Sequence, residues 1–207
     1  MTAPVTAGKA FNVATIVLAG GASRRAGSVN KLLASYRGKP LVRHAVETVA
    51  AAPLFVRICV TGHDARRVGR SIEETGIQIV YNKDHTQGVS SSIITGLRAL
   101  PAETDGVLIV LGDMPEVTVD ILNSLIAAFS DNAGRSICVP TYRGRRGNPV
   151  LWPQTRFSDI LALEGDMGAR NLLRIHAAEV VEVPVDSDGI LHDVDLPDEI
   201  AAEGKPS

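Results

Sequence analysis

A glycine-rich segment followed by cationic side chains is the first place where this chain has residues suited to binding a ligand. It reads Leu18-Ala-Gly-Gly-Ala-Ser-Arg-Arg-Ala-Gly-Ser-Val-Asn-Lys31. Adjacent Gly20 and Gly21 permit a tight turn whose backbone N–H groups point at a phosphate, and Arg25 and Lys31 would neutralise the charge of that phosphate. The spacing fits neither the GxGxxG dinucleotide fingerprint nor the P-loop. The segment therefore predicts a phosphate-binding turn, with a solvated basic loop as the alternative.

A single acid after an apolar run is the second chemical feature. Asp113, in Leu-Gly-Asp-Met-Pro, directly follows the run 107–111, so its carboxylate is expected at the end of a buried strand. Such a hard oxygen ligand suits Mg²⁺ carried by a triphosphate, which needs only one or two protein carboxylates. Asp195, in His-Asp-Val-Asp-Leu-Pro-Asp, is the candidate second ligand. The alternatives are a carboxylate that caps the turn at Asp113 and a helix-capping motif around Asp195.

The basic residues are concentrated near the amino-terminal end, although the whole chain carries a formal net charge of -2. Residues 1–46 hold 7 of the 21 Lys and Arg and no Asp or Glu, which leaves 14 basic against 23 acidic residues, or -9, in the remainder. A cationic site in an otherwise acidic protein predicts a small anionic ligand. It argues against nucleic acid or a membrane surface as a partner.

The composition is that of an ordinary globular protein. The 207 residues, 45% hydrophobic and 21% charged, predict one domain with a sizeable core. No apolar run reaches the roughly 18 residues of a membrane span. The first residues contain no apolar stretch typical of a signal peptide, so we expect a cytoplasmic protein. Cys59 and Cys138 stand 79 positions apart inside apolar runs, which predicts buried thiols rather than a disulfide or a metal site.

Short apolar runs alternate with helical patterns along the first two thirds of the chain. Strands are expected at 13–19, 54–60, 77–81, 106–111 and 136–139, and helices at 41–50, 65–74, from 90 onward, and at 119–129. This alternation predicts right-handed βαβ units and an α/β fold with a doubly wound, mostly parallel sheet. Ligands of such sheets bind at the carboxyl ends of the strands. We therefore expect the glycine-rich segment and Asp113 to face one crevice.

The pattern loosens after residue 140. Residues 142–149 read Tyr-Arg-Gly-Arg-Arg-Gly-Asn-Pro and are followed by two short helical patterns and a strand expected near 179–185. We interpret this stretch as a small appended lobe that covers the edge of the sheet.

Five segments of the chain, taken in order, carry a resemblance to a known family. They are Leu18-Ala-Gly-Gly-x-Ser-x-Arg-x-Gly-x-x-Asn-Lys-Leu-Leu33, Gly112-Asp-Met-Pro115, Gly147-x-Pro149, Gly165-Asp-x-Gly-Ala-Arg170 and Asp193-x-Asp-x-Pro197. Together they resemble the MobA-like nucleotidyltransferase family, and most of all its molybdenum cofactor cytidylyltransferase (MocA-like) branch. The resemblance implies a Rossmann-like GT-A fold and Mg²⁺. It also implies transfer of a nucleotidyl group, CMP rather than GMP, from an NTP to the phosphate of molybdopterin with release of pyrophosphate.

The same resemblance implies roles for individual residues. It implies Arg25, Lys31 and Asp113 as catalytic residues, and Asp113 and Asp195 as metal ligands. It places at the nucleotide Leu18, Ala19, Gly20, Gly21, Ser23, Gly88, Ser90 and Ser91, and on the acceptor side Arg145, Arg146, Asn148, Asp166 and Arg170. The chain is then a single domain, 1–207, with a nucleotide-binding half at about 11–140 and an acceptor-binding lobe at about 141–203. The pterin phosphate would attack the α-phosphorus in line, with the protein positioning both substrates.

Two other functions stay open at the level of the sequence. One is a carrier that delivers a molybdenum cofactor to a molybdenum hydroxylase without doing chemistry, and it would bind its pterin equally well after Asp113→Ala. The other is a relative recruited as an NAD(P)H-dependent reductase, similar to nicotine blue oxidoreductase, against which the missing GxGxxG argues. For the transferase, CTP and GTP both stay open as the nucleotide substrate, and a molybdenum hydroxylase is the expected recipient of the product.

Overall fold

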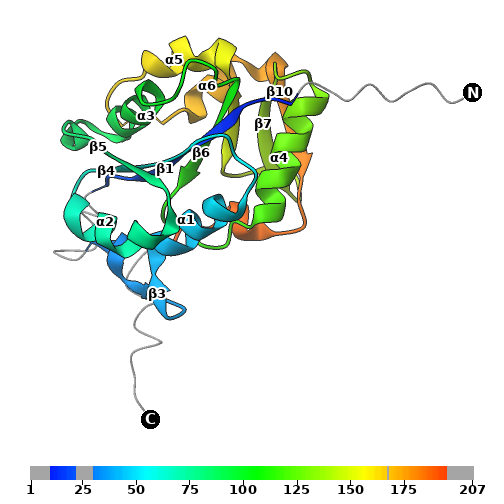
Figure 1. Ribbon diagram of the computed structural model, residues 1–207. Coiled ribbons are helices and arrows are strands. Elements are labelled where there is room, and N and C mark those ends of the chain that lie inside the picture. The colour runs from blue at the N-terminus through cyan, green and yellow to red at the C-terminus, as the bar shows by residue number, and fades with distance from the viewer. Residues whose placement is uncertain (1–9, 22–29, 167, 195–207) are drawn as a thin grey trace, which may run out of the picture.

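The computed structural model describes residues 10–21, 30–166 and 168–194, which form a mixed sheet with helices on both faces (Figure 1). The strands of this sheet are β1 (Val13–Ala19), β4 (Arg57–Thr61), β5 (Gln78–Tyr81), β6 (Gly106–Leu111), β7 (Ile137–Tyr142), β8 (Arg145–Arg146), β9 (Val150–Pro153) and β10 (Val180–Pro184). A separate hairpin consists of β2 (Ser35–Tyr36) and β3 (Lys39–Pro40).

The strand order across the sheet is β10-β7-β9-β6-β1-β4-β5, with β8 paired to β7. β1 runs parallel to both β4 and β6, β4 parallel to β5, and β7 parallel to β10. β9 is antiparallel to both of its neighbours. From β1 the chain moves outward to β4 and β5, and then returns to place β6 on the other side of β1. At such a reversal a crevice opens at the carboxyl ends of the two central strands.

Helices cover both faces of the sheet (Figure 1). One face carries α1 (Leu41–Ala51), α2 (Ala65–Ile72) and α4 (Val119–Asp131), and the other carries α3 (Val89–Arg98), α5 (Phe157–Leu161) and α6 (Arg170–Ile175). Short 3-10 turns are η2 (Lys31–Leu33), η3 (Glu73–Thr75), η4 (His85–Gln87), η5 (Gln154–Arg156), η6 (Ala177–Glu179) and η7 (Asp188–Ile190). None of the helices in the described ranges has the length and apolar character that crossing a membrane requires.

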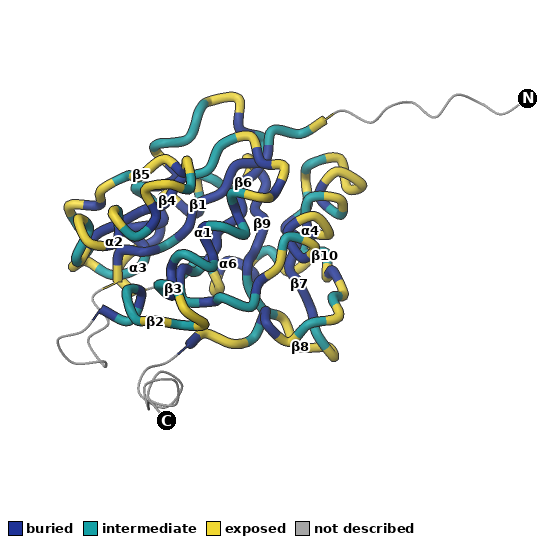
Figure 2. Tube along the Cα trace, turned by 60° about the horizontal axis from the view of Figure 1, so that its bottom comes forward, coloured by how far each residue is buried: buried dark blue, intermediate teal, exposed yellow. Residues whose placement is uncertain are grey.

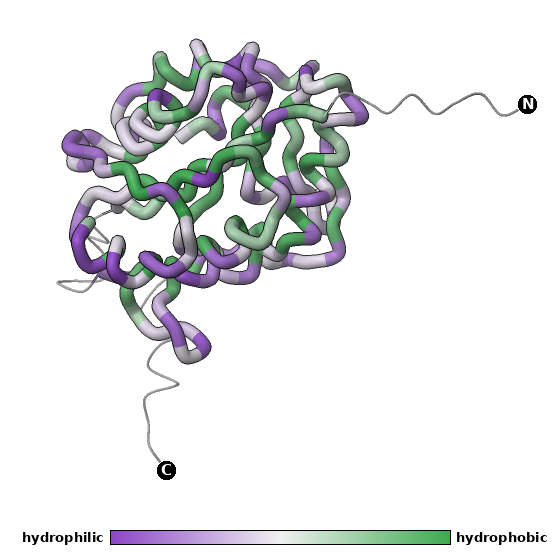
Figure 3. The backbone as a smooth tube through the Cα atoms, in the orientation of Figure 1, coloured by the Kyte–Doolittle hydropathy of each residue, from purple (hydrophilic) through white to green (hydrophobic). Residues whose placement is uncertain are grey.

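β1 contributes side chains to the hydrophobic core on each side of the sheet. Val13 and Val17 pack with the layer of α1 and α4, whereas Ile16 packs with the layer of α3, and all three are at most 2% exposed. Burial on both faces explains why this strand is apolar at every position but Thr15, whose Oγ1 donates to the Leu108 carbonyl, instead of alternating. Figures 2 and 3 show the central strands as buried and hydrophobic. The predicted α/β fold and mostly parallel sheet are therefore confirmed.

The carboxyl-terminal third differs from the lobe that the sequence predicts. β9 lies inside the sheet between β6 and β7, and β10 forms its edge beside β7. Trp152 of β9 is 1% exposed and packs into the core on the α3 side. The local pattern did not indicate β9, because its four residues follow Pro149 and its pairing partners are far away in the sequence. Residues after 140 thus complete the main sheet instead of covering its edge.

Candidate functional site

The turn after β1 is fixed to both neighbouring strands. The Gly112 N–H donates to the Leu18 carbonyl at 3.0 Å, and the His63 N–H donates to the Gly20 carbonyl at 3.2 Å. These bonds hold the glycine turn between the residues that follow β4 and β6. Gly20, Gly21 and Asp113 consequently line one cavity.

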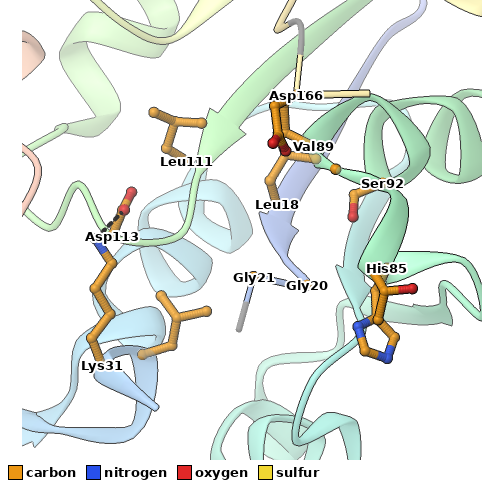
Figure 4. Close-up of a pocket in the computed structure, with 13 residues that line it drawn as sticks. Leu18, Gly20, Gly21, Lys31, His85, Val89, Ser92, Leu111, Asp113 and Asp166 are labelled. Atoms are coloured by element: carbon orange, nitrogen blue, oxygen red, sulfur yellow. Dashed lines mark ion pairs between the residues drawn. The ribbon is translucent and has the colours of Figure 1, made fainter. Parts of the chain in front are cut away.

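This first cavity has a volume of about 410 Å³ (Figure 4). In Figure 4, Lys31 and Asp113 lie on one side and His85 and Ser92 on the opposite side, with the glycine turn between them. The other lining residues are Leu18, Leu32, Thr86, Gly88, Val89, Leu111 and Asp166. The cavity therefore has a charged side with the Lys31–Asp113 ion pair and a polar side with His85 and Ser92, and Asp166 adds a second carboxylate to the lining.

Lys31 and Asp113 form an ion pair on the charged side. The Lys31 Nζ lies 2.7 Å from the Asp113 Oδ2, and the two side chains are 18% and 21% exposed. The Lys31 Nζ also donates to the Val194 carbonyl at 3.4 Å, while the Val194 N–H donates to the Asp113 carbonyl at 2.9 Å. η2 presents Lys31, since the preceding Asn30 Oδ1 accepts from the Leu32 N–H at 3.1 Å. A cation and a hard oxygen ligand thus stand side by side where screening by water is reduced.

The polar side depends on Asn82, a residue that the sequence analysis did not select. Asn82 directly follows β5 and is 1% exposed. Its Nδ2 donates to the Oγ atoms of Ser91 and Ser92 at 2.8 and 3.0 Å. Its Oδ1 accepts from the Asp84 N–H at 2.9 Å and the Thr95 Oγ1 at 3.2 Å. The side chain therefore joins α3 to the end of β5. The sequence does contain a signal for Asn82, because a polar side chain follows an apolar strand there, as Asp113 does after β6.

The three consecutive serines of α3 have three different environments. The Ser90 Oγ donates to the Gly165 carbonyl at 2.6 Å, and the Ser91 Oγ donates to the Gly88 carbonyl at 2.8 Å. Neither Ser90 nor Ser91 lines the cavity, whereas Ser92 does. All three hydroxyls are therefore bonded within the protein, since the Ser92 Oγ accepts from Asn82, and of the three serines only Ser92 also lines the cavity.

Gly88 brings the loop after α5 to the cavity. Its φ is +101°, a conformation that other residues rarely adopt, and a Cβ at this position would collide with the Gly165 carbonyl. Asp166 follows Gly165 and lines the first cavity, as Gly88 does, and Figure 4 shows Asp166 next to Val89. Only glycine at position 88 lets the two segments meet so closely.

A second cavity, of about 590 Å³, adjoins the first, since Leu18, Val89 and Leu111 line both. Among the residues expected on the acceptor side, Arg146, Asn148 and Arg170 line this second cavity and Asp166 lines the first. Arg145 is exposed on β8 and lines neither cavity, and Ala19 is fully buried behind the turn. The predicted acceptor residues are therefore divided between two adjoining spaces.

Three of the expected site residues, Ser23, Arg25 and Asp195, lie outside the described residues. The described residues beside them are at the site. Gly21 lines the first cavity, and Val194 is hydrogen-bonded to both members of the Lys31–Asp113 pair.

Asp113 offers a carboxylate to a metal ion on the charged side of the first cavity. Within the described ranges, no three His, Cys, Asp or Glu side chains cluster as metal ligands would. One partly accessible carboxylate fits Mg²⁺ that arrives with a triphosphate, because such an ion takes its other ligands from phosphate oxygens and water. The donor set therefore suits a metal–nucleotide complex more than a resident metal ion.

Comparisons with known proteins identify relatives of this chain. The model of the MobA-like NTP transferase domain matches residues 15–181. The purine catabolism protein PucB of Bacillus subtilis (strain 168) is 31% identical over 195 residues, which cover 89% of this chain and 92% of PucB. Nicotine blue oxidoreductase of Paenarthrobacter nicotinovorans is 32% identical over 168 residues, which cover 78% of this chain and 81% of that enzyme.

A solved structure shows the same architecture. The crystal structure of the Mycobacterium tuberculosis Rv0371c homologue from Mycobacterium sp. strain JC1 matches with a TM-score of 0.80 and 29% identity, covering 92% of this chain and 96% of that one. The range matched by the family model contains the Lys31–Asp113 pair and the α6 arginines of the second cavity. The chain belongs to the family of MobA-like NTP transferase domains.

Proposed function

We propose that this chain transfers a nucleotidyl group from an NTP to the phosphate of an organic acceptor and releases pyrophosphate. The observation that carries the proposal is the Lys31–Asp113 pair, at the carboxyl ends of β1 and β6, in a cavity that adjoins a second one. The pair offers a cation for the phosphates and a carboxylate for their metal ion, and the adjoining cavity offers room for a second substrate. Membership in a family of NTP transferase domains supports an NTP as the donor.

The reaction is a substitution at the α-phosphorus. An oxygen of the acceptor phosphate forms the new P–O bond, the bond from the α-phosphorus to the oxygen bridging the β-phosphorus breaks, and pyrophosphate leaves with the electron pair. Lys31 binds the triphosphate by charge-assisted hydrogen bonds, and Asp113 would hold Mg²⁺, which neutralises the phosphate charge when bound. The chain's own contribution is to hold the two substrates in line for attack.

We further propose molybdopterin as the acceptor, and CTP in preference to GTP as the donor. The support is the motif Gly165-Asp-x-Gly-Ala-Arg170 and the serine run, both similar to the cytidylyltransferase branch. The product would be a dinucleotide form of the molybdenum cofactor, and a molybdenum hydroxylase would receive it.

Release of pyrophosphate tests the proposed function. The protein is incubated with Mg²⁺, molybdopterin and each of the four NTPs in turn. We expect pyrophosphate only when the acceptor is present, and more of it with CTP than with GTP. Asp113→Asn should abolish release, because a neutral amide is a poor ligand for Mg²⁺. Asp120→Asn, on the exposed face of α4, is the matched control and should leave release unchanged. No pyrophosphate with any nucleotide would contradict the proposal.

A reductase is the second candidate, and the 32% identity to nicotine blue oxidoreductase favours it. Such an enzyme needs a site for a hydride donor, and the turn after β1 lacks the glycine spacing of a dinucleotide-binding fingerprint. Steady oxidation of NADPH in the presence of a dye acceptor, with none in a mock preparation, would support the reductase. Release of pyrophosphate without oxidation of NADPH would support the transferase and contradict the reductase.

A further inference from the structure

The second cavity has a mainly apolar interior. β6 and β9 contribute Ile109, Val150 and Trp152, α3 contributes Ile93, and α6 contributes Leu173. No Asp or Glu stands among the described residues that line it. A cavity of this size and character is suited to burying the apolar body of a small organic molecule.

Two arginines of α6 line the same cavity, and their side chains form no ion pair or hydrogen bond within the described residues. Arg170 and Arg174 stand four positions apart, both are exposed, and neither bonds to another described residue. Side chains at this spacing are neighbours on a helix, so their like charges repel. By contrast, Arg146 at the same cavity is paired with Glu182 at 2.8 Å. The α6 guanidiniums are therefore the groups suited to an anion, since their paired N–H donors match phosphate or carboxylate oxygens.

Trp152 supplies a flat apolar wall and an unpaired donor. The residue is 1% exposed and lines the cavity, and its Nε1 is buried with no acceptor in the described part of the chain. Buried polar groups in folded proteins nearly always have a hydrogen-bond partner. The unpaired Nε1 is thus an unsatisfied donor in a residue that lines the cavity.

We propose that this cavity binds a flat, mainly apolar organic anion of the aryl phosphate class. Its ring lies against Trp152 and Leu173, and its phosphate is held by Arg170 and Arg174. That this anion is the acceptor of the transfer rests on the proposed function. Because the described lining is mainly apolar, binding of the ring does not depend on hydrogen-bond donors of the ring, so the site takes simple aryl phosphates and is not restricted to pterins. Ring and anion are both required for strong binding.

The emission of Trp152 reports on this cavity, because it is the only tryptophan of the chain. The probe is 4-nitrophenyl phosphate, whose ring quenches indole emission by energy transfer. As controls, 4-nitrobenzyl alcohol supplies the ring without the anion and inorganic phosphate supplies the anion without the ring, while N-acetyltryptophanamide corrects for light absorbed by the probes. We expect saturable quenching by 4-nitrophenyl phosphate, binding at least about tenfold tighter than the alcohol, and no displacement by an equal concentration of phosphate.

Substitution of the arginines locates the anion. Arg170→Gln and Arg174→Gln act at exposed positions, so the fold should persist, as thermal melts will show. Each should raise the Kd of 4-nitrophenyl phosphate about tenfold, and neither should change quenching by the alcohol. Arg98→Gln, at an exposed position of α3 outside both cavities, is the matched control and should change neither. The proposal would be overturned if quenching by 4-nitrophenyl phosphate does not saturate. It would also be overturned if the parent and a variant with both substitutions bind this probe equally well.

These titrations contain no nucleotide and no metal ion, so they do not depend on the transfer reaction. If 4-nitrophenyl phosphate binds as expected and no NTP yields pyrophosphate, the cavity assignment holds and the proposed function fails. If molybdopterin supports release of pyrophosphate while 4-nitrophenyl phosphate does not bind, the cavity assignment fails and the proposed function holds.

Discussion

At the scale of the residue, the candidate site rests on one partly buried ion pair. Lys31 and Asp113 form an ion pair at 2.7 Å, in which each charge offsets the other. In the proposed complex, a triphosphate with its metal ion would give each of them a new partner of opposite charge. A partly buried charge without a partner of opposite sign destabilises the folded protein. If each side chain exchanges its present partner for the triphosphate or its metal ion, neither charge is left unpaired before or after binding.

The two cysteines should be unreactive in the folded protein. Burial raises the pKa of the Cys59 and Cys138 thiols to about 12, and the thiolate is the reactive form. At about pH 8, 5,5′-dithiobis(2-nitrobenzoate) should therefore modify neither thiol within minutes. After unfolding in guanidinium chloride, the same reagent should titrate both. Rapid modification of either thiol in the folded protein would show that the core around it opens readily.

The same thiols should make stability depend on pH in alkaline solution. Their ordinary pKa is 9.0, and burial raises it to about 12 in the folded chain. Above about pH 9 the unfolded chain therefore holds fewer protons than the folded one, and the free energy of unfolding decreases as pH rises. Urea denaturation at about pH 8 and pH 10 measures this change, and replacement of both cysteines by Ala should reduce it.

At the scale of the element, strand ends and the first turns of α3 build the site. β1 and β6 place the glycine turn and Asp113 at one edge of the sheet, and α3 places Gly88 and Ser92 opposite. Asn82 joins these parts, since its side chain bonds to Ser91, Ser92 and Thr95 of α3. The geometry of the polar side of the cavity consequently depends on a residue that does not itself line it.

Asn82→Ala should disturb both stability and the nucleotide cavity. It removes four hydrogen bonds of a buried side chain, so we expect a loss of about 3 kcal/mol in the free energy of unfolding. Nucleotide binding should weaken as well, because Ser92 loses its support. Urea denaturation and calorimetry measure the two effects. Asn132→Ala, which removes one exposed bond at the end of α4, is the control and should cost far less. Equal losses in the two variants would contradict the role given to Asn82.

Local sequence predicted the parallel strands of the main sheet that alternate with helices, and it missed β9, which is buried at all four positions. β1 and β6 have the bounds expected from their apolar runs, 13–19 and 106–111. β9 is also an apolar run, but it has only four residues next to Pro149, and its place between β6 and β7 is set by antiparallel pairing that the local pattern does not show. The serines of α3 show the same limit at the site. Their types are identical and all three bond within the protein, and only the phase of the helix decides that Ser92 also lines the cavity while Ser90 and Ser91 do not.

At the scale of the whole molecule, one sheet joins the residues before 140 to those after it. β9 contacts both β6 and β7, so the carboxyl-terminal third cannot leave the sheet without exposing the centre of it. The two cavities share Leu18, Val89 and Leu111, which places both substrates of the proposed reaction against the same strands.

This continuity predicts a single cooperative unfolding transition. Trp152 reports on β9, whereas far-ultraviolet circular dichroism reports on the helices of both parts. The two signals should change at the same urea concentration, because a sheet shared by both parts unfolds as one unit. Two separated transitions would indicate that the part after residue 140 is an independent lobe.

The central claim is that the crevice at the carboxyl ends of β1 and β6 binds an NTP through Lys31. Calorimetric titration of the parent protein and Lys31→Gln with CTP and with GTP, in Mg²⁺, tests it most directly. Thermal melts check folding, and Lys83→Gln, an exposed lysine outside both cavities, is the control. We predict that the parent binds one nucleotide per chain and that Lys31→Gln binds it about ten- to a hundredfold more weakly, because a charge-assisted hydrogen bond to phosphate is lost. Equal affinity of the parent and Lys31→Gln for both nucleotides, or no binding by the parent, would contradict the account.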